Sequence, residues 1–239
     1  MSVGPVLLTF DVDWAPDFAI DATAALLIER GIRATWMITH RSPAIDRLRA
    51  HPELFELGIH PNFREGSTHG STTDAVLRHC MELVPEAVSM RTHSLVQSTP
   101  LLARVLTATP IRIDASLLLP RVQGLRPFTQ PYDGNALLRV PFDWQDDVEM
   151  EFADSRWSAR PLLEQSGMLT FNFHPIHVYL NSRDMDPYRD VRASVAKLDE
   201  LDEADARRRV HGGVGAMTML RELAERVDPR RMKLLKELR

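Results

Sequence analysis

Short hydrophobic runs alternate along the chain with segments in which hydrophobic residues recur at helical spacing. The runs predict strands at residues 4–10, 34–39, 54–59, 88–90, 111–113, 136–140 and 168–173. The segments between them predict helices at residues 18–30, 74–84, 99–107 and 160–165. Strands that alternate with helices indicate a parallel sheet with crossover helices. About seven such units in one domain favour an α/β fold, specifically a distorted (β/α)7 TIM-like barrel.

Two regions depart from this alternation. Residues 120–134 contain three prolines and two glycines, which predicts a long loop of the functional or mobile kind. From about Tyr188 the chain becomes rich in charged residues, which predicts a helical C-terminal extension of a single domain spanning residues 1–239.

Polar residues with catalytic or metal-binding chemistry follow the hydrophobic runs. They are Asp11 and Asp13, His40, His60, Arg91 and His93, Asp114 and His174. In a parallel barrel the C-terminal ends of the strands meet at one face, where active sites gather. The sequence therefore predicts one site built from distant segments.

The pair Asp11 and Asp13 ends the first predicted strand. Side chains two residues apart on a strand point to the same side, so the two carboxylates are expected to lie together. Adjacent carboxylates repel unless a cation or a shared proton offsets their charge. A bound metal ion is the simplest offset. The alternative is that Asp13 merely starts a loop while Asp11 caps local backbone.

Composition excludes several classes of protein. The 239 residues are 44% hydrophobic, enough for a full core, and the net charge of −4 gives no sign of a nucleic-acid partner. The single cysteine, Cys80, forms no internal disulfide. No run approaches the roughly 18 apolar residues of a transmembrane segment. The N-terminus lacks the pattern of a signal peptide, so a cytoplasmic protein is expected. No feature indicates an oligomeric state.

Five short motifs resemble those of the polysaccharide deacetylase family, the NodB-homology carbohydrate esterases, and specifically its Asp-Val-Asp branch. They are Thr9-Phe10-Asp11-Val12-Asp13, Gly58-Ile59-His60-Pro61-Asn62, Met90-Arg91-Thr92-His93, Asp114-Ala115-Ser116 and Phe173-His174-Pro175. The resemblance covers about residues 6–182. It implies a barrel of about seven strands, a divalent metal held by one Asp and two His, and removal of an N-acetyl group from a sugar.

The resemblance implies a role for each residue of the site. Asp13 and His60 are the expected ligands of a divalent metal, most simply zinc, and Asp11 is the expected general base. Arg91 would pair with Asp11 and keep it ionised. His174 would protonate the departing amine.

The family pattern breaks at the third ligand. A histidine usually lies four residues after the first, but here that position is Arg64, which cannot bind a metal. His69 is the favoured substitute, because imidazole binds zinc more strongly than the amide oxygen of Asn62. If neither serves, the site binds metal poorly.

Five further residues are candidates for contacts with the substrate: His93, Ser94, Asp114, Tyr132 and Trp144. The backbone N–H near Ser94 is a candidate donor to the oxyanion. The two aromatic residues are candidates for stacking on sugar faces. For Asp114, capping of a strand end is an equally good interpretation.

These features favour a metal-dependent hydrolase that removes an N-acetyl group from an amino sugar. A precursor of a surface polysaccharide or O-antigen, linked to a nucleotide or a lipid, is the expected substrate. One alternative is a non-catalytic sugar-binding or assembly protein on the same scaffold, which the departure at Arg64 favours. Another is a hydrolase of a different C–N bond.

Overall fold

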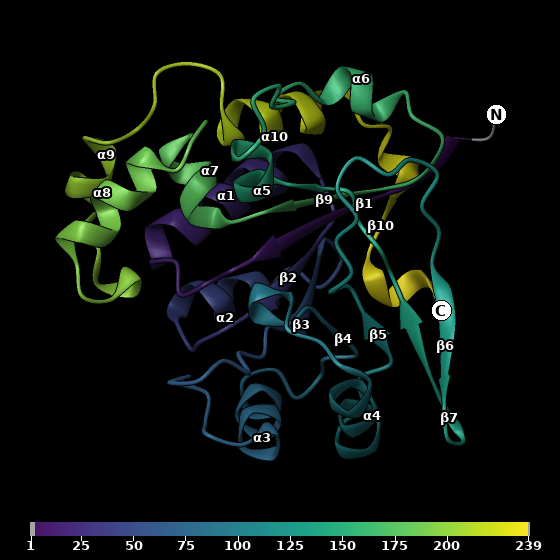
Figure 1. Cartoon of the computed structure of the whole chain (residues 1–239). Helices are drawn as coiled ribbons and strands as arrows, with labels where there is room; N and C mark the ends of the chain where they lie inside the picture. The colour runs from purple at the N-terminus through teal and green to yellow at the C-terminus, as the bar shows by residue number, and fades with distance from the viewer. Residues whose placement is uncertain (1–2, 239) are drawn as a thin grey trace.

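A single curled sheet with helices around it forms the molecule (Figure 1), and the computed structural model describes residues 3–238. The strands are β1 (Val3–Asp11), β2 (Ala34–Ile38), β3 (Phe55–Ile59), β4 (Ser89–Met90), β5 (Ile113–Asp114), β6 (Phe128–Tyr132), β7 (Asn135–Arg139), β8 (Trp144–Gln145), β9 (Gly167–Phe173) and β10 (Met232–Lys233). The α-helices are α1 (Asp17–Arg30), α2 (Pro43–Arg49), α3 (Thr73–Leu83), α4 (Thr99–Ala108), α5 (Asp146–Met150), α6 (Ala159–Leu163), α7 (Pro175–Leu180), α8 (Asp186–Ser194), α9 (Glu203–Arg207) and α10 (Ala216–Arg226).

The strand order is β6-β7-β5-β4-β3-β2-β1-β9-β8, with β10 paired beside β1. Every pairing is parallel except that of β6 with β7. The prediction of a distorted barrel is confirmed. The strand path stays open, because β6 and β8 are its two ends.

Strand β1 lies at the centre and its side chains alternate between two hydrophobic clusters. Phe10 belongs to the large cluster shared with the helices and stacks on Trp36 of β2, with ring centroids 4.4 Å apart. Leu7 belongs to the smaller cluster, with residues of β2, β5 and β9. Because strand side chains alternate, Leu7, Thr9 and Asp11 share one face of β1. Asp11 therefore enters the site from that face, at the C-terminal end of the strand.

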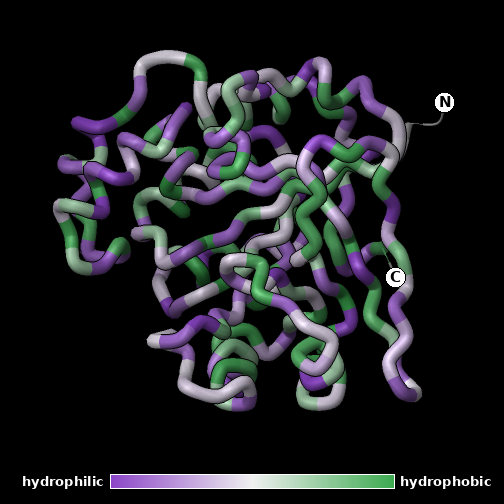
Figure 2. Tube along the Cα trace, in the orientation of Figure 1, coloured by the Kyte–Doolittle hydropathy of each residue, from purple (hydrophilic) through white to green (hydrophobic). Residues whose placement is uncertain are grey.

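The C-terminal segment returns to the sheet instead of leaving it. Leu235 belongs to the smaller cluster and donates its N–H to Thr35 Oγ1 (3.2 Å). The buried Glu56 accepts the N–H of Lys236 (2.8 Å). Figure 2 shows hydrophilic segments along α8 and α9, on the opposite side of the molecule from this contact.

The region predicted to be a long loop contains strand β6, so that prediction is wrong for residues 128–132. The β6–β7 hairpin turns at Gly134, whose φ of 76° suits glycine. Its proline and glycine content reflects this turn and an edge strand. Among the described residues, no helix is long and apolar enough to cross a membrane.

Candidate metal centre

Asp13 leaves the strand and enters a turn. Strand β1 ends at Asp11. In the turn that follows, Asp13 has a φ of 46° and Trp14 a φ of 55°. Non-glycine residues seldom adopt such angles, and they cluster at functional sites. The two carboxylates therefore converge through a left-handed turn, not through the alternation of a continuous strand.

Three side chains meet around one carboxylate oxygen. Asp13 Oδ1 lies 3.0 Å from His60 Nε2 and 3.0 Å from His93 Nδ1. One ligand atom from each residue lies within 4.8 Å of the other two, as a shared metal ion requires. His60 follows β3 directly, and His93 begins the 3-10 turn His93–Leu95 after β4. The residue expected to touch substrate, His93, thus stands beside Asp13 and His60.

His69 is buried a short way from this group, and both of its ring nitrogens have protein partners. Nε2 lies 2.8 Å from the carbonyl oxygen of Thr39, and Nδ1 accepts the N–H of Asn62 (3.2 Å). Its ring also packs against Trp14, with centroids 5.3 Å apart. Burial, the main cause, lowers the pKa of His69 to about 4, despite the Thr39 carbonyl. Both ring nitrogens of His69 therefore have protein partners, and it is His93 that lies beside Asp13 and His60.

Asp11 is held by a buried polar network. Arg91 Nη1 donates to Asp11 Oδ1 (2.9 Å), and Asn172 Nδ2 donates to Asp11 Oδ2 (2.8 Å). Arg91 also donates to the Thr9 hydroxyl (3.0 Å), and its Nε donates to the Ala115 carbonyl (2.8 Å). Arg91 is fully buried, so its charge is compensated almost entirely inside the protein. This network fixes the carboxylate of Asp11 beside the three-residue group.

The carboxylates of the site ionise easily. Burial by itself would raise the pKa of Asp11, but Arg91 and the imidazoles of His60 and His174 outweigh it and hold that pKa below its usual value. Burial likewise opposes ionisation of Asp13, and His60 and His93 overcome it, so the pKa of Asp13 lies well below its usual range. Both groups are therefore anionic near neutral pH.

His174 faces the two aspartates from β9, with Nε2 lying 3.6 Å from Asp13 Oδ2 and 4.0 Å from Asp11 Oδ2. Its other ring nitrogen, Nδ1, lies 2.6 Å from Asp146 Oδ1, and its backbone N–H donates to Asp146 Oδ2 (2.7 Å). Burial alone would lower the pKa of His174. Asp146, followed by Asp147, reverses this and raises the pKa well above 6.5. The ring is thus a cation with Nε2 directed at the aspartates.

Asp114 contacts the segment that carries Arg91 and His93 through a chain of buried hydrogen bonds. It pairs with Arg139 (2.7 Å) and accepts the hydroxyl of Ser116 (2.6 Å). Ser116 Oγ in turn accepts the N–H of Thr92 (2.9 Å). Asp114 is fully buried, so this chain of bonds positions the backbone between Arg91 and His93.

Ser94 directly follows His93 and adopts a φ of 53°. Its hydroxyl accepts a hydrogen bond from Arg64 Nη1 (3.2 Å). Arg64, which occupies the position where a ligand was expected, therefore contacts the segment that carries His93.

The two aromatic candidates differ in their surroundings. Trp144 is fully buried against Phe173, with centroids 4.7 Å apart, so it has no face to offer a sugar, contrary to the expectation from the sequence. Tyr132 lies at the turn of the β6–β7 hairpin, where it pairs with Asn135. The backbone of Tyr132 is thus at the N-terminal end of β7, although its side chain reaches close enough to Arg139 and Asp114 for their charges to act on its pKa. Trp14, in contrast, lines the cleft beside His93.

Two polar residues of the site were not expected from the sequence. Asp146 begins α5 directly after β8. Asn172 lies within β9 among hydrophobic residues. A polar residue in an otherwise buried strand is a usable signal, because it needs partners in the interior.

Comparisons with known proteins find a family model and similar solved structures. The family model WbmS-like: Polysaccharide deacetylase matches residues 8–192. A solved structure from Bordetella bronchiseptica, WbmS, assigned as a polysaccharide deacetylase involved in O-antigen biosynthesis, is 35% identical, with a TM-score of 0.80 over 94% of this chain and 91% of that chain. The 4-alpha-glucanotransferase of Thermococcus litoralis is 10% identical, with a TM-score of 0.53 over 98% of this chain and 37% of that chain, which shows a shared fold alone. No curated protein matches the chain.

Proposed function

Because the chain belongs to the WbmS-like polysaccharide deacetylase family, we propose that it is a metal-dependent hydrolase of N-acetylated amino sugars. The proposed substrate is an amino-sugar unit of a surface polysaccharide or its precursor. The O-antigen role assigned to the similar Bordetella protein supports this class of substrate. The observation that carries the proposal is the convergence of His60 and His93 on one oxygen of Asp13, with Asp11 and His174 beside it.

The donor atoms fit a divalent metal. Asp13, His60 and His93 would hold it, and one carboxylate with two imidazoles is a common ligand set of catalytic zinc. When bound, the metal would lower the pKa of water and polarise the acetyl carbonyl. His93 supplies the imidazole that position 64 lacks. The departure at Arg64 therefore no longer favours a non-catalytic binding protein.

The other residues of the site would carry out the proton transfers, one as the general base and one as the general acid. Asp11, ionised and held by Arg91 and Asn172, would accept the proton of the water that attacks the acetyl carbon. His174 would donate its Nε2 proton to the sugar nitrogen as the C–N bond breaks, which releases acetate and the free amine. The Ser94 N–H, next to His93 in the chain, is the proposed donor to the developing oxyanion.

The test is acetate release from N-acetylated amino sugars by the zinc-loaded protein. Asp11→Asn is expected to lower kcat by roughly 10²- to 10⁴-fold, the usual contribution of a general base. Asp190→Asn, at an exposed position, is the matched control and should retain full activity. The proposal fails if no metal supports turnover of any acetylated amino sugar, or if Asp11→Asn is as active as the control.

A further inference from the structure

The metal centre opens onto a cleft that extends well beyond the three proposed ligands. The cleft has a volume of about 680 Å³ and is lined by Asp13, Trp14 and His93 together with Arg41 and Arg192. Ligand sites usually occupy roughly 300–1,000 Å³. The cleft therefore has room for a group joined to the sugar as well as for the sugar itself.

The walls of the cleft carry several cationic side chains. Apart from Asp13, the charged side chains that line it are Arg41, Arg192, Lys197 and Asp199. Together with Asp13, three cations face two anions, and Lys197 pairs with Glu200 (3.4 Å). The cations left without a carboxylate partner are the two arginines, in a chain whose net charge is −4.

Both arginines of the cleft lack a carboxylate partner within residues 3–238. The Arg41 side chain donates only to the carbonyl oxygen of Glu82 (3.0 Å), and the Arg192 side chain forms no hydrogen bond or ion pair in that part of the chain. Arg189, one turn earlier on α8, does pair, with Asp186 at 3.0 Å. The two guanidinium groups at the cleft are therefore free to bind an anion.

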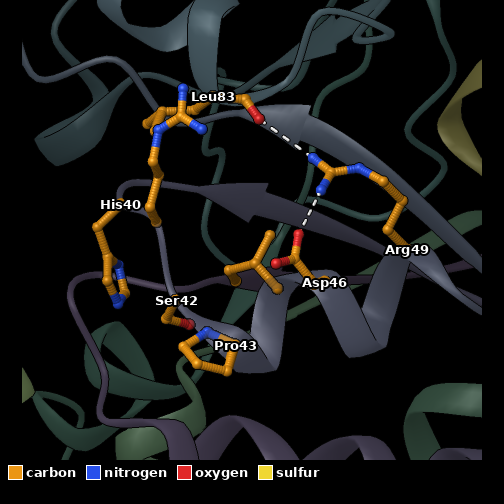
Figure 3. Close-up of a pocket in the computed structure, with 8 residues that line it drawn as sticks. His40, Ser42, Pro43, Asp46, Arg49 and Leu83 are labelled. Atoms are coloured by element: carbon orange, nitrogen blue, oxygen red, sulfur yellow. Dashed lines mark hydrogen bonds and ion pairs between the residues drawn. The ribbon is translucent and has the colours of Figure 1, made fainter.

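A second, smaller hollow of about 300 Å³ adjoins the cleft and shares His40, Arg41 and Leu83 with it. Figure 3 shows Arg49 in this hollow, where it binds Asp46 (2.9 Å) and the carbonyl oxygen of Leu83 (3.1 Å). Arg49 is thus already neutralised. Arg41 lines both hollows and has no carboxylate partner in residues 3–238.

We propose that the cleft binds a diphosphate group attached to the amino sugar, with Arg41 and Arg192 contacting the phosphate oxygens. Guanidinium groups match phosphate in shape and charge and form paired hydrogen bonds with it. The inference rests on the proposed deacetylation for the position of the sugar, beside Asp13 and His93. The substrate class is then a diphosphate-linked N-acetylated amino sugar, whose carrier is a nucleoside or a polyprenyl chain.

The binding site is tested without catalysis, by calorimetric titration of the zinc-loaded protein with inorganic pyrophosphate and with uridine diphosphate. Arg41→Gln combined with Arg192→Gln is expected to weaken binding by roughly tenfold per arginine, as loss of a charge-assisted hydrogen bond does. Arg189→Gln is the control, on the same helix and equally exposed, and should bind like the unaltered protein. Equal binding by the double variant and the control overturns the inference.

Measurements of acetate release then distinguish a nucleoside carrier from a polyprenyl carrier. They also distinguish failure of this inference from failure of the proposed function. The double variant should show a raised KM for diphosphate-linked sugars and an unchanged KM for the free N-acetylated sugar. The nucleoside-linked and polyprenyl-linked substrates identify the carrier by which of them is hydrolysed. Arginine-dependent pyrophosphate binding without any acetate release supports the anion site and refutes deacetylation. Acetate release with no pyrophosphate binding refutes the anion site alone.

Discussion

The pairing of His174 with Asp146 makes Asp146→Asn an informative substitution. Asp146 accepts hydrogen bonds from both the ring Nδ1 and the backbone N–H of His174, and both side chains are buried. Asparagine keeps the shape but removes the negative charge and can accept with only one oxygen. The imidazolium of His174 then loses its main compensation, while the burial that opposes its charge remains.

The size of the effect follows from the contact. An opposite charge in direct contact shifts a pKa by about 1–3 units, and two units correspond to about 3 kcal/mol. We therefore expect the pKa of His174 to fall by about two units in Asp146→Asn. Because the general acid must carry its proton, the alkaline limb of the kcat profile should move down by the same amount. At a pH above both alkaline limbs, kcat should fall by up to roughly 10²-fold, and by less at neutral pH.

The assay combines two readouts on the zinc-loaded protein. The pH profile of acetate release reports the working pKa, and NMR titration of the His174 ring reports it without substrate. Asp147→Asn is the matched control, because Asp147 raises the pKa of His174 without contacting it and should shift it less. If Asp146→Asn shifts neither the alkaline limb of the pH profile nor the titration of the His174 ring, His174 is not an acid whose proton is held by Asp146.

Three further predictions concern the ligands and the fold. His93→Ala should reduce bound zinc to well below one ion per chain, as measured by elemental analysis after desalting. The control His69→Ala should retain its zinc, and equal retention in both variants would contradict the proposed ligand set. Gly58→Ala should cost about 1–3 kcal/mol in urea unfolding, because a Cβ would lie 2.8 Å from Ser89 Oγ, and an unchanged midpoint would contradict this packing. Burial raises the pKa of Asp143 to about 6 from 3.8, so the native state keeps a proton that the unfolded chain releases. The contribution of Asp143 to stability should therefore decline by about 3 kcal/mol as the pH rises from about 4 to 6, and Asp143→Asn should remove that contribution from the slope of urea titrations across that range.

The sequence by itself determined the sheet and the face that carries the site. The run predicted at residues 168–173 is strand β9 at Gly167–Phe173, and that predicted at 54–59 is β3 at Phe55–Ile59. These elements follow from local periodicity, since a buried strand needs a hydrophobic run whatever its neighbours are. The residues after such runs meet because parallel strands end on one side.

Only the tertiary structure decided which of these residues touch. His69 and His93 both follow the strands in loops, and the sequence favoured His69 over Asn62 because imidazole binds zinc more strongly than an amide oxygen. The left-handed backbone at Asp13 and Ser94 instead accompanies the approach of His93 to Asp13, while the Thr39 carbonyl and the Asn62 N–H occupy His69. Asp146 likewise reaches His174 across 28 residues of chain. Contacts of about 3 Å depend on loop dihedral angles and on which strands are neighbours, and hydrophobic periodicity encodes neither.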